Sequence, residues 1–186
     1  MELENLLEDI KKRGINLWLE NNKLQIYSPK KNILTSDDID NFRQNKQKIL
    51  QFLKKGDYIS KSYPLSRGQK ALYFIHEMSP ESAAYNIGFA IRILSRLDTE
   101  AMQKTLQALI ERHASLRTGF ARQENGKLVQ NVYTYKKFHL ENIDASNWNE
   151  SELKTQVQKA HEKPFDLSNA SLFRAKLFSK AKSEHI

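Results

Sequence analysis

Apolar side chains in the first 55 residues follow a helical spacing first and a strand spacing afterwards. Four of them share one helical face: Leu3, Leu6, Leu7 and Ile10. Gly14 follows at a position where helices commonly end in a left-handed residue. Residues 15–20 and 23–27 then alternate apolar and polar side chains around Asn21-Asn22, a pair that tolerates the positive φ of a tight turn. This pattern predicts a helix followed by a β-hairpin.

The hairpin pattern predicts that Leu24 and Ile26 face a core. Thr35, with Asp38 three residues later, forms an imperfect capping box that starts a helical segment. An apolar stripe follows, across one or two short helices: Ile39, Phe42, Ile49 and Leu53. A two-stranded sheet of this kind buries a small core and leaves open edges that have to be protected or used.

The rest of the chain mixes helix and strand patterns after a predicted linker at residues 56–62. Ser66 with Gln69 forms a second capping box, which predicts a helix up to Met78. The other predicted elements are strands at 87–94, 118–122, 127–133, 139–143 and 172–178, and helices that start after Asp98 and after Asn149. This order predicts an α+β fold with a boundary near residue 56. The expected units are residues 1–55 and 63–186.

Composition narrows the possible functions. The chain has no Cys, which excludes a disulfide scaffold, thiolate metal sites and Cys nucleophiles. Its net charge of +8 is spread over both units without a zinc-finger spacing or a long basic run, so we expect no nucleic-acid partner. It has no signal-peptide pattern and no apolar stretch of the roughly 20 residues that cross a bilayer. We expect a cytoplasmic protein without a membrane partner, whose excess charge can attract acidic proteins or peptides.

Two motifs in the second unit resemble those of one enzyme family. Residues 112–120 read R-H-x-x-L-R-T-x-F, which resembles the second core motif of the condensation domains of nonribosomal peptide synthetases. Residues 64–74 resemble the first core motif of the same family. The third motif, H-H-x-x-x-D-G, carries the family's catalytic His and does not occur in this sequence.

The resemblance implies an incomplete α/β sandwich half of the chloramphenicol-acetyltransferase type, from a domain that joins two carrier-bound acyl groups by a peptide bond. In the family, the Arg at the position of Arg112 pairs with the Asp of the third motif, so we expect Arg112 to be exposed or to make a substitute contact. His113 and Arg117 complete the motif, and His113 stands at a helix end where the dipole favours a cation. We expect no catalytic residue and no metal site in this chain, and no condensation by it alone.

The N-terminal pattern resembles the β-hairpin docking domains of synthetase subunits of the tubulysin type, with a predicted αββα(α) order. The stretches that carry the resemblance are Gly14–Trp18, Glu20–Leu24 and Ile33–Thr35. Such domains add a short linear motif from the C-terminus of an upstream subunit as an extra strand. The residues expected to bind this peptide are Lys23, Leu24, Gln25, Ile26, Tyr27, Lys30 and Lys31.

Three hypotheses for the function remain open at this point. The first is a synthetase segment that docks an upstream subunit and contributes to condensation. Its partners would be that subunit and carrier proteins, whose phosphopantetheine arms bring the substrates, with no cofactor bound by the chain itself. The second is a docking adaptor that binds a synthetase peptide and catalyses nothing. The third is an unrelated small basic α+β protein, which would require two ordered motifs and the whole N-terminal pattern to match by coincidence.

Overall fold

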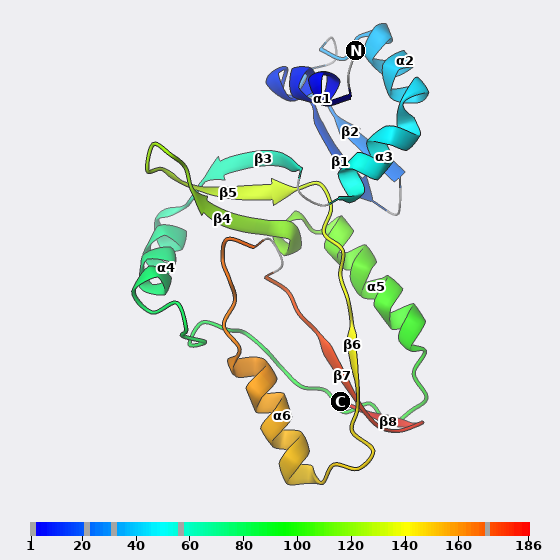
Figure 1. Cartoon of the computed structure of the whole chain (residues 1–186), viewed down its shortest axis with the longest axis vertical. Coiled ribbons are helices and arrows are strands. Elements are labelled where there is room, and N and C mark those ends of the chain that lie inside the picture. The colour runs from blue at the N-terminus through cyan, green and yellow to red at the C-terminus, as the bar shows by residue number, and fades with distance from the viewer. Residues whose placement is uncertain (1–2, 21–22, 31–32, 56–57, 170–171) are drawn as a thin grey trace.

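A computed structural model of the protein describes residues 3–20, 23–30, 33–55, 58–169 and 172–186. The N-terminal unit, up to residue 55, lies at one end of the molecule (Figure 1). The second unit starts at Tyr58. It extends away from the N-terminal unit, through two small sheets, to α6 at the opposite end of the molecule. None of the helices in the described part of the chain is long and apolar enough to cross a bilayer.

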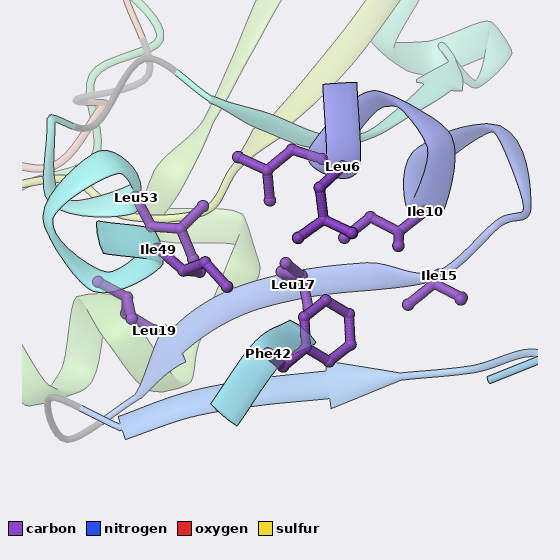
Figure 2. Close-up of a cluster of buried hydrophobic side chains, with 9 residues drawn as sticks. Leu6, Ile10, Ile15, Leu17, Leu19, Phe42, Ile49 and Leu53 are labelled. Carbon is purple, nitrogen blue, oxygen red and sulfur yellow. The ribbon is translucent and has the colours of Figure 1, made fainter. Parts of the chain in front are cut away.

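The N-terminal unit is an αββαα arrangement, as the sequence predicts. Its elements are α1 (Leu3–Lys12), β1 (Asn16–Glu20), β2 (Lys23–Tyr27), α2 (Ser36–Gln44) and α3 (Lys46–Lys54). The helices cover one face of the antiparallel hairpin and enclose a core with it (Figure 2). The buried members of this core are Leu6, Leu7, Ile10, Ile15, Leu17, Leu19, Phe42, Ile49 and Leu53.

Two local features set how the helices meet the hairpin. Gly14 turns the chain from α1 into β1 and has φ +76°. This backbone conformation is unfavourable for any residue that carries a Cβ atom. Thr35 and Asp38 form the predicted capping box at the start of α2. The carboxylate of Asp38 also accepts hydrogen bonds from Nη1 and Nη2 of Arg13 at 2.8 and 2.7 Å. This bidentate pair joins the end of α1 to the first turn of α2.

The second unit is the α+β fold that the sequence predicts. Its elements are β3 (Ile59–Pro64), α4 (Arg67–Met78), α5 (Thr99–Arg112), the 3-10 helix η1 (Ala114–Arg117), β4 (Thr118–Arg122), β5 (Leu128–Tyr133), β6 (Glu141–Asp144), α6 (Glu150–Glu162), β7 (Lys176–Ala181) and β8 (Glu184–His185). One sheet has the antiparallel order β3-β5-β4, and the other has the order β6-β7-β8, in which β6 and β7 are parallel. The capping box at Ser66 and Gln69 is present. The predicted strands around residues 118–133 also form, whereas the strand predicted at 172–178 is shifted to β7.

The two units are joined by direct contacts. The Tyr58 hydroxyl donates a hydrogen bond to the carbonyl of Leu7 at 3.1 Å, and its ring meets Phe52 edge-on at 5.7 Å between centroids. The N–H of Leu19 donates to the carbonyl of Thr134 at 3.3 Å. Thr134 is fully buried, and its own N–H donates to the carbonyl of Tyr58 at 2.9 Å. The N-terminal unit is therefore packed against the second unit, although the sequence predicts a linker between them.

The linker prediction for residues 56–62 is wrong for its later part, because Ile59–Pro64 forms strand β3. This strand lies at the edge of its sheet, is paired with β5 and contains a register irregularity between Ile59 and Lys61. Its Ser and Lys residues suit an exposed edge, where pairing is made by the backbone. Residues of this kind do not show the apolar alternation that marks a strand in a sequence.

The predicted strand at residues 87–94 is also wrong. Among the described residues it forms a single bridge, in which Ile93 and His185 exchange hydrogen bonds at 2.8 and 3.0 Å. The side chains of Ile87 and Phe89 are 97% and 87% exposed. A strand forms only where a neighbouring strand pairs with it along its length. The neighbour of this segment is β8, which is only two residues long. In the N-terminal unit, Ile39 and Ile26 are likewise more exposed than the sequence predicts.

Candidate functional site

The open edge of the hairpin follows from the pairing register. Leu19 lies opposite Leu24, and the N–H of Leu19 bonds outside the hairpin, to Thr134. In an antiparallel pair, residues that do not bond to each other point their N–H and C=O groups to opposite outer edges. Leu24, and by alternation Ile26, therefore present backbone groups on the outer edge of β2. No backbone group in the described part of the chain bonds to that edge.

The same register also sets the direction of the Gln25 backbone. Gln25 lies opposite Trp18, in a pair whose backbone groups face each other within the hairpin. The N–H of Gln25 is therefore used inside the hairpin, and an added strand would bond to Leu24 and Ile26. The Leu24 side chain packs partly into the core, whereas the Ile26 side chain, predicted to face inward, is 38% exposed.

Basic side chains stand near both ends of β2. Lys23 and Lys30 are exposed, and Lys31 lies outside the described residues. Sequence patterns do not identify a further one, Lys61, because it falls in the predicted linker. Its ammonium lies 4.7 Å from the ring centroid of Tyr27, whose side chain is 49% exposed at the end of β2.

The second core motif runs from the end of α5 into β4. His113 caps α5, with its N–H donating to the carbonyl of Leu109 at 2.9 Å, and leads into η1. The hydroxyl of Thr118 donates to the carbonyl of Ala114 at 2.8 Å and holds η1 against the first residue of β4. Arg112 and His113 are both exposed, and Arg112 takes part in no ion pair among the described residues.

Arg117 is buried, as are Thr118 and Gly119 after it, and the sequence does not predict the burial of this arginine. Its Nη1 donates a hydrogen bond to the carbonyl of Tyr133, while its buried Nε has no partner among the described residues. Burial lowers the pKa of Arg117, and the negative charges of Glu20 and Glu111 oppose that effect. Glu20 ends β1, so the motif is electrostatically linked to the N-terminal unit.

The first core motif starts at the end of β3 and continues along α4. None of the side chains of α4 is buried. Four large apolar residues of this helix are exposed: Leu72, Phe74, Ile75 and Met78. The following segment adds further exposed apolar residues: Tyr85, Ile87, Phe89, Ile91 and Leu94. Within the described residues, no three His, Asp or Glu side chains come together in a way that could hold a metal ion.

Two protein-family models match the chain. Residues 3–55 match the TubC N-terminal docking domain, and residues 59–186 match the condensation domain. Bacitracin synthase 2 of Bacillus licheniformis is 28% identical over 198 aligned positions, which cover 100% of this chain and 7% of that protein. One of the linear gramicidin synthase subunits of Brevibacillus parabrevis is 38% identical over 127 positions, which cover 66% of this chain and 2% of that protein.

Solved structures share the fold of the second unit. A four-domain nonribosomal peptide synthetase bound to AMP and glycine has a TM-score of 0.64 and 19% identity over 69% of this chain and 10% of its own. The first condensation domain of the CDA synthetase has a TM-score of 0.59 and 19% identity over 68% of this chain and 34% of its own. The chain spans only a small part of its curated relatives. It belongs to the condensation-domain family of nonribosomal peptide synthetases and carries a TubC-type docking domain before the condensation segment.

Proposed function

We propose that this chain receives the C-terminal peptide of an upstream synthetase subunit as a third strand on the outer edge of β2. In the complete synthetase, its condensation segment would contribute to joining a donor and an acceptor that carrier proteins hold on phosphopantetheine arms. We place the unit boundary between residues 55 and 59, because the docking resemblance ends at the first and the condensation resemblance begins at the second.

One observation carries the docking proposal: the hairpin has one occupied edge and one open edge. On β1, Leu19 already bonds to Thr134. On β2, the outward groups of Leu24 and Ile26 bond to no backbone group of the described residues. An extended peptide can satisfy these groups by β-augmentation, in which main-chain bonds supply affinity and alternate side chains supply selectivity.

The chemistry of the partner follows from the charges beside that edge. Lys23 and Lys30 are exposed and form no ion pair among the described residues. An incoming peptide with carboxylates therefore gains favourable electrostatic contacts and faster association. Ordering a short peptide costs several kcal/mol, so an affinity on the order of micromolar is expected.

The exposed apolar residues of α4 and of segment 85–94 support the condensation part of the proposal. Large exposed apolar side chains gathered in one stretch of a chain commonly mark a surface that another part of a protein covers. The chain also covers only 34% of a solved single condensation domain. We propose that the remainder of such a domain covers these residues in the complete synthetase, and that Arg112 supports the catalytic loop there.

In that reaction, the acceptor amine forms a C–N bond to the donor carbonyl while the C–S bond of the thioester breaks. The amine loses one proton, and the leaving thiolate takes up one proton to become a thiol. The sequence contains no H-H-x-x-x-D-G motif. Incubation of this polypeptide with loaded donor and acceptor carrier proteins should therefore yield no dipeptide by mass spectrometry, while a complete condensation domain gives product. Dipeptide above the protein-free background would contradict this part of the proposal.

The docking proposal is tested by titrating the labelled chain with synthetic peptides that alternate Val and Glu and end in a free carboxylate. We expect NMR shifts concentrated in β2. Ile26→Pro removes an outward N–H and keeps the bonds inside the hairpin, so it should weaken binding about tenfold, since one strand bond is lost. Ile26→Ala keeps the N–H and is the matched control. Shifts confined to α1, or equal binding by the two variants, would contradict the proposal.

A further inference from the structure

Lys61 lies outside the docking domain and yet beside the docking edge. It belongs to β3, within the condensation segment that starts at residue 59. Its ammonium lies 4.7 Å from the Tyr27 ring centroid, at the end of β2 away from Lys23. Tyr27 remains 49% exposed, so this cation stands beside a surface that a partner can reach.

The charge of Lys61 is not neutralised in the described part of the chain. Three other lysines of the second unit hold carboxylates at 2.6 to 2.8 Å: Lys104, Lys176 and Lys180. Lys61 forms no such pair among the described residues, and its ammonium lies against the face of Tyr27 instead. An ammonium that contacts only an aromatic ring can still form an ion pair with a carboxylate of a partner.

The position of Lys61 is held by the contacts between the two units. Tyr58, just before β3, donates to the carbonyl of Leu7 on α1 at 3.1 Å. The carbonyl of Tyr58 in turn accepts from the N–H of Thr134, whose carbonyl accepts from the N–H of Leu19 on β1 at 3.3 Å. These bonds fix β3 against the hairpin, so Lys61 is placed relative to β2 before any partner arrives.

We infer that the docking site is composite: Lys61 of the condensation segment binds a carboxylate of the incoming peptide at the Tyr27 end of β2. This inference rests on the docking proposed above and specifies the partner's chemistry. Lys23 and Tyr27 are four residues apart on β2, and the alternation of a strand puts both on the same face. A strand paired along β2 then brings carboxylates to Lys23 and Lys61 when its acidic residues are also four apart. The partner is an extended peptide with a Glu-x-x-x-Glu spacing.

The test measures binding of fluorescent synthetic peptides to the whole chain by anisotropy at several salt concentrations. The first peptide contains Glu-x-x-x-Glu. The second, control peptide is identical except that the Glu expected to lie beside Tyr27 is replaced by Gln. Lys61→Gln is compared with Lys159→Gln, which makes the same charge change at an exposed position. Lys159 belongs to α6, at the far end of the molecule from the hairpin (Figure 1). Lys61→Gln should weaken binding of the Glu-x-x-x-Glu peptide about twofold to fivefold and reduce its salt dependence, since exposed charge pairs have this size.

Lys159→Gln should leave the affinity unchanged, and Lys61→Gln should have no effect on the Gln-substituted peptide, because the pair is already broken there. Equal affinities for Lys61→Gln and Lys159→Gln, together with weak binding by Ile26→Pro, would overturn the composite site and leave docking on β2 intact. Absence of binding by the unaltered chain would overturn both.

Discussion

Replacing Asp38 by Asn tests the contact that holds α2 over the hairpin core. The Asp38 side chain is only 9% exposed, and its two oxygens accept from Arg13 at 2.7 and 2.8 Å. One of these oxygens also accepts from the N–H of Thr35 at 2.8 Å. Asn keeps one acceptor for the capping box but removes the charge, so Arg13 loses its bidentate partner.

The expected loss is about 2–3 kcal/mol of unfolding free energy. Removal of one partner from a buried ion pair costs about 3–5 kcal/mol. The cost should be lower here because Arg13 is 29% exposed and retains Asp9 at 2.8 Å. Asp40 is the matched control on the same helix: its pair with Arg43 is long, at 3.3 Å, and both side chains are mostly exposed. Asp40→Asn should cost about 0.5 kcal/mol or less.

The effect should depend on pH in a defined direction. The hydrogen bonds from Arg13 hold the pKa of Asp38 well below its usual range; burial opposes this shift and Thr35 adds to it. A carboxyl whose pKa is lowered by folding stabilises the folded state above its unfolded pKa of about 3.9, and that stability is lost as the pH falls. The difference between the native protein and Asp38→Asn should therefore be full at neutral pH and shrink below about pH 5.

Urea unfolding of the whole chain measures this difference, with Trp18 fluorescence as the probe. The second Trp of the sequence, Trp148, is replaced by Phe in all variants so that the signal reports on the docking domain. Equal midpoints for Asp38→Asn and Asp40→Asn at neutral pH would show that the Arg13–Asp38 pair does not hold α2 in place. A difference between the native protein and Asp38→Asn that grows as the pH is lowered would contradict the direction given for the Asp38 pKa.

Three further substitutions probe other parts of the chain. Gly14→Ala should destabilise the docking domain by about 1 kcal/mol in the same assay, because Gly14 has φ +76°; an unchanged midpoint would contradict the turn. Arg117→Met should cost about 1–3 kcal/mol because it removes a buried guanidinium and its hydrogen bond to the Tyr133 carbonyl, whereas Arg112→Met should stay within about 0.5 kcal/mol. Equal losses, measured by circular dichroism, would show that burial does not distinguish the two motif arginines. Phe89→Ser combined with Ile91→Ser should reduce binding of the dye ANS without lowering stability, because both side chains are exposed; a lower midpoint would show that they are packed.

The features predicted correctly from the sequence depend on residues close together in the chain. A capping box needs two residues three positions apart, so Thr35 with Asp38 and Ser66 with Gln69 are recognisable without the fold. The hairpin is equally local, because its two strands are separated by two residues. The family resemblance likewise rests on short contiguous motifs at residues 64–74 and 112–120.

The features that sequence patterns miss depend on distant segments. Residues 87–94 have a strand's alternation, but a strand also needs a neighbour, which the pattern of one segment does not report. The burial of Arg117 depends on the end of β5, and the position of Lys61 depends on a hairpin far earlier in the chain. The bond between Leu19 and Thr134, which occupies the outer edge of β1, joins distant segments, and no local pattern predicts it.

Hydrogen exchange at the backbone of β2 shows whether a peptide adds to this edge as a strand. The exchange rates of individual amides are compared by NMR without peptide and with saturating Val/Glu peptide. We expect the amides of Leu24 and Ile26, which point outward, to become protected on binding. We expect no change at Gln25, whose amide already bonds within the hairpin. Peptide binding that leaves Leu24 and Ile26 in fast exchange would contradict strand addition at this edge.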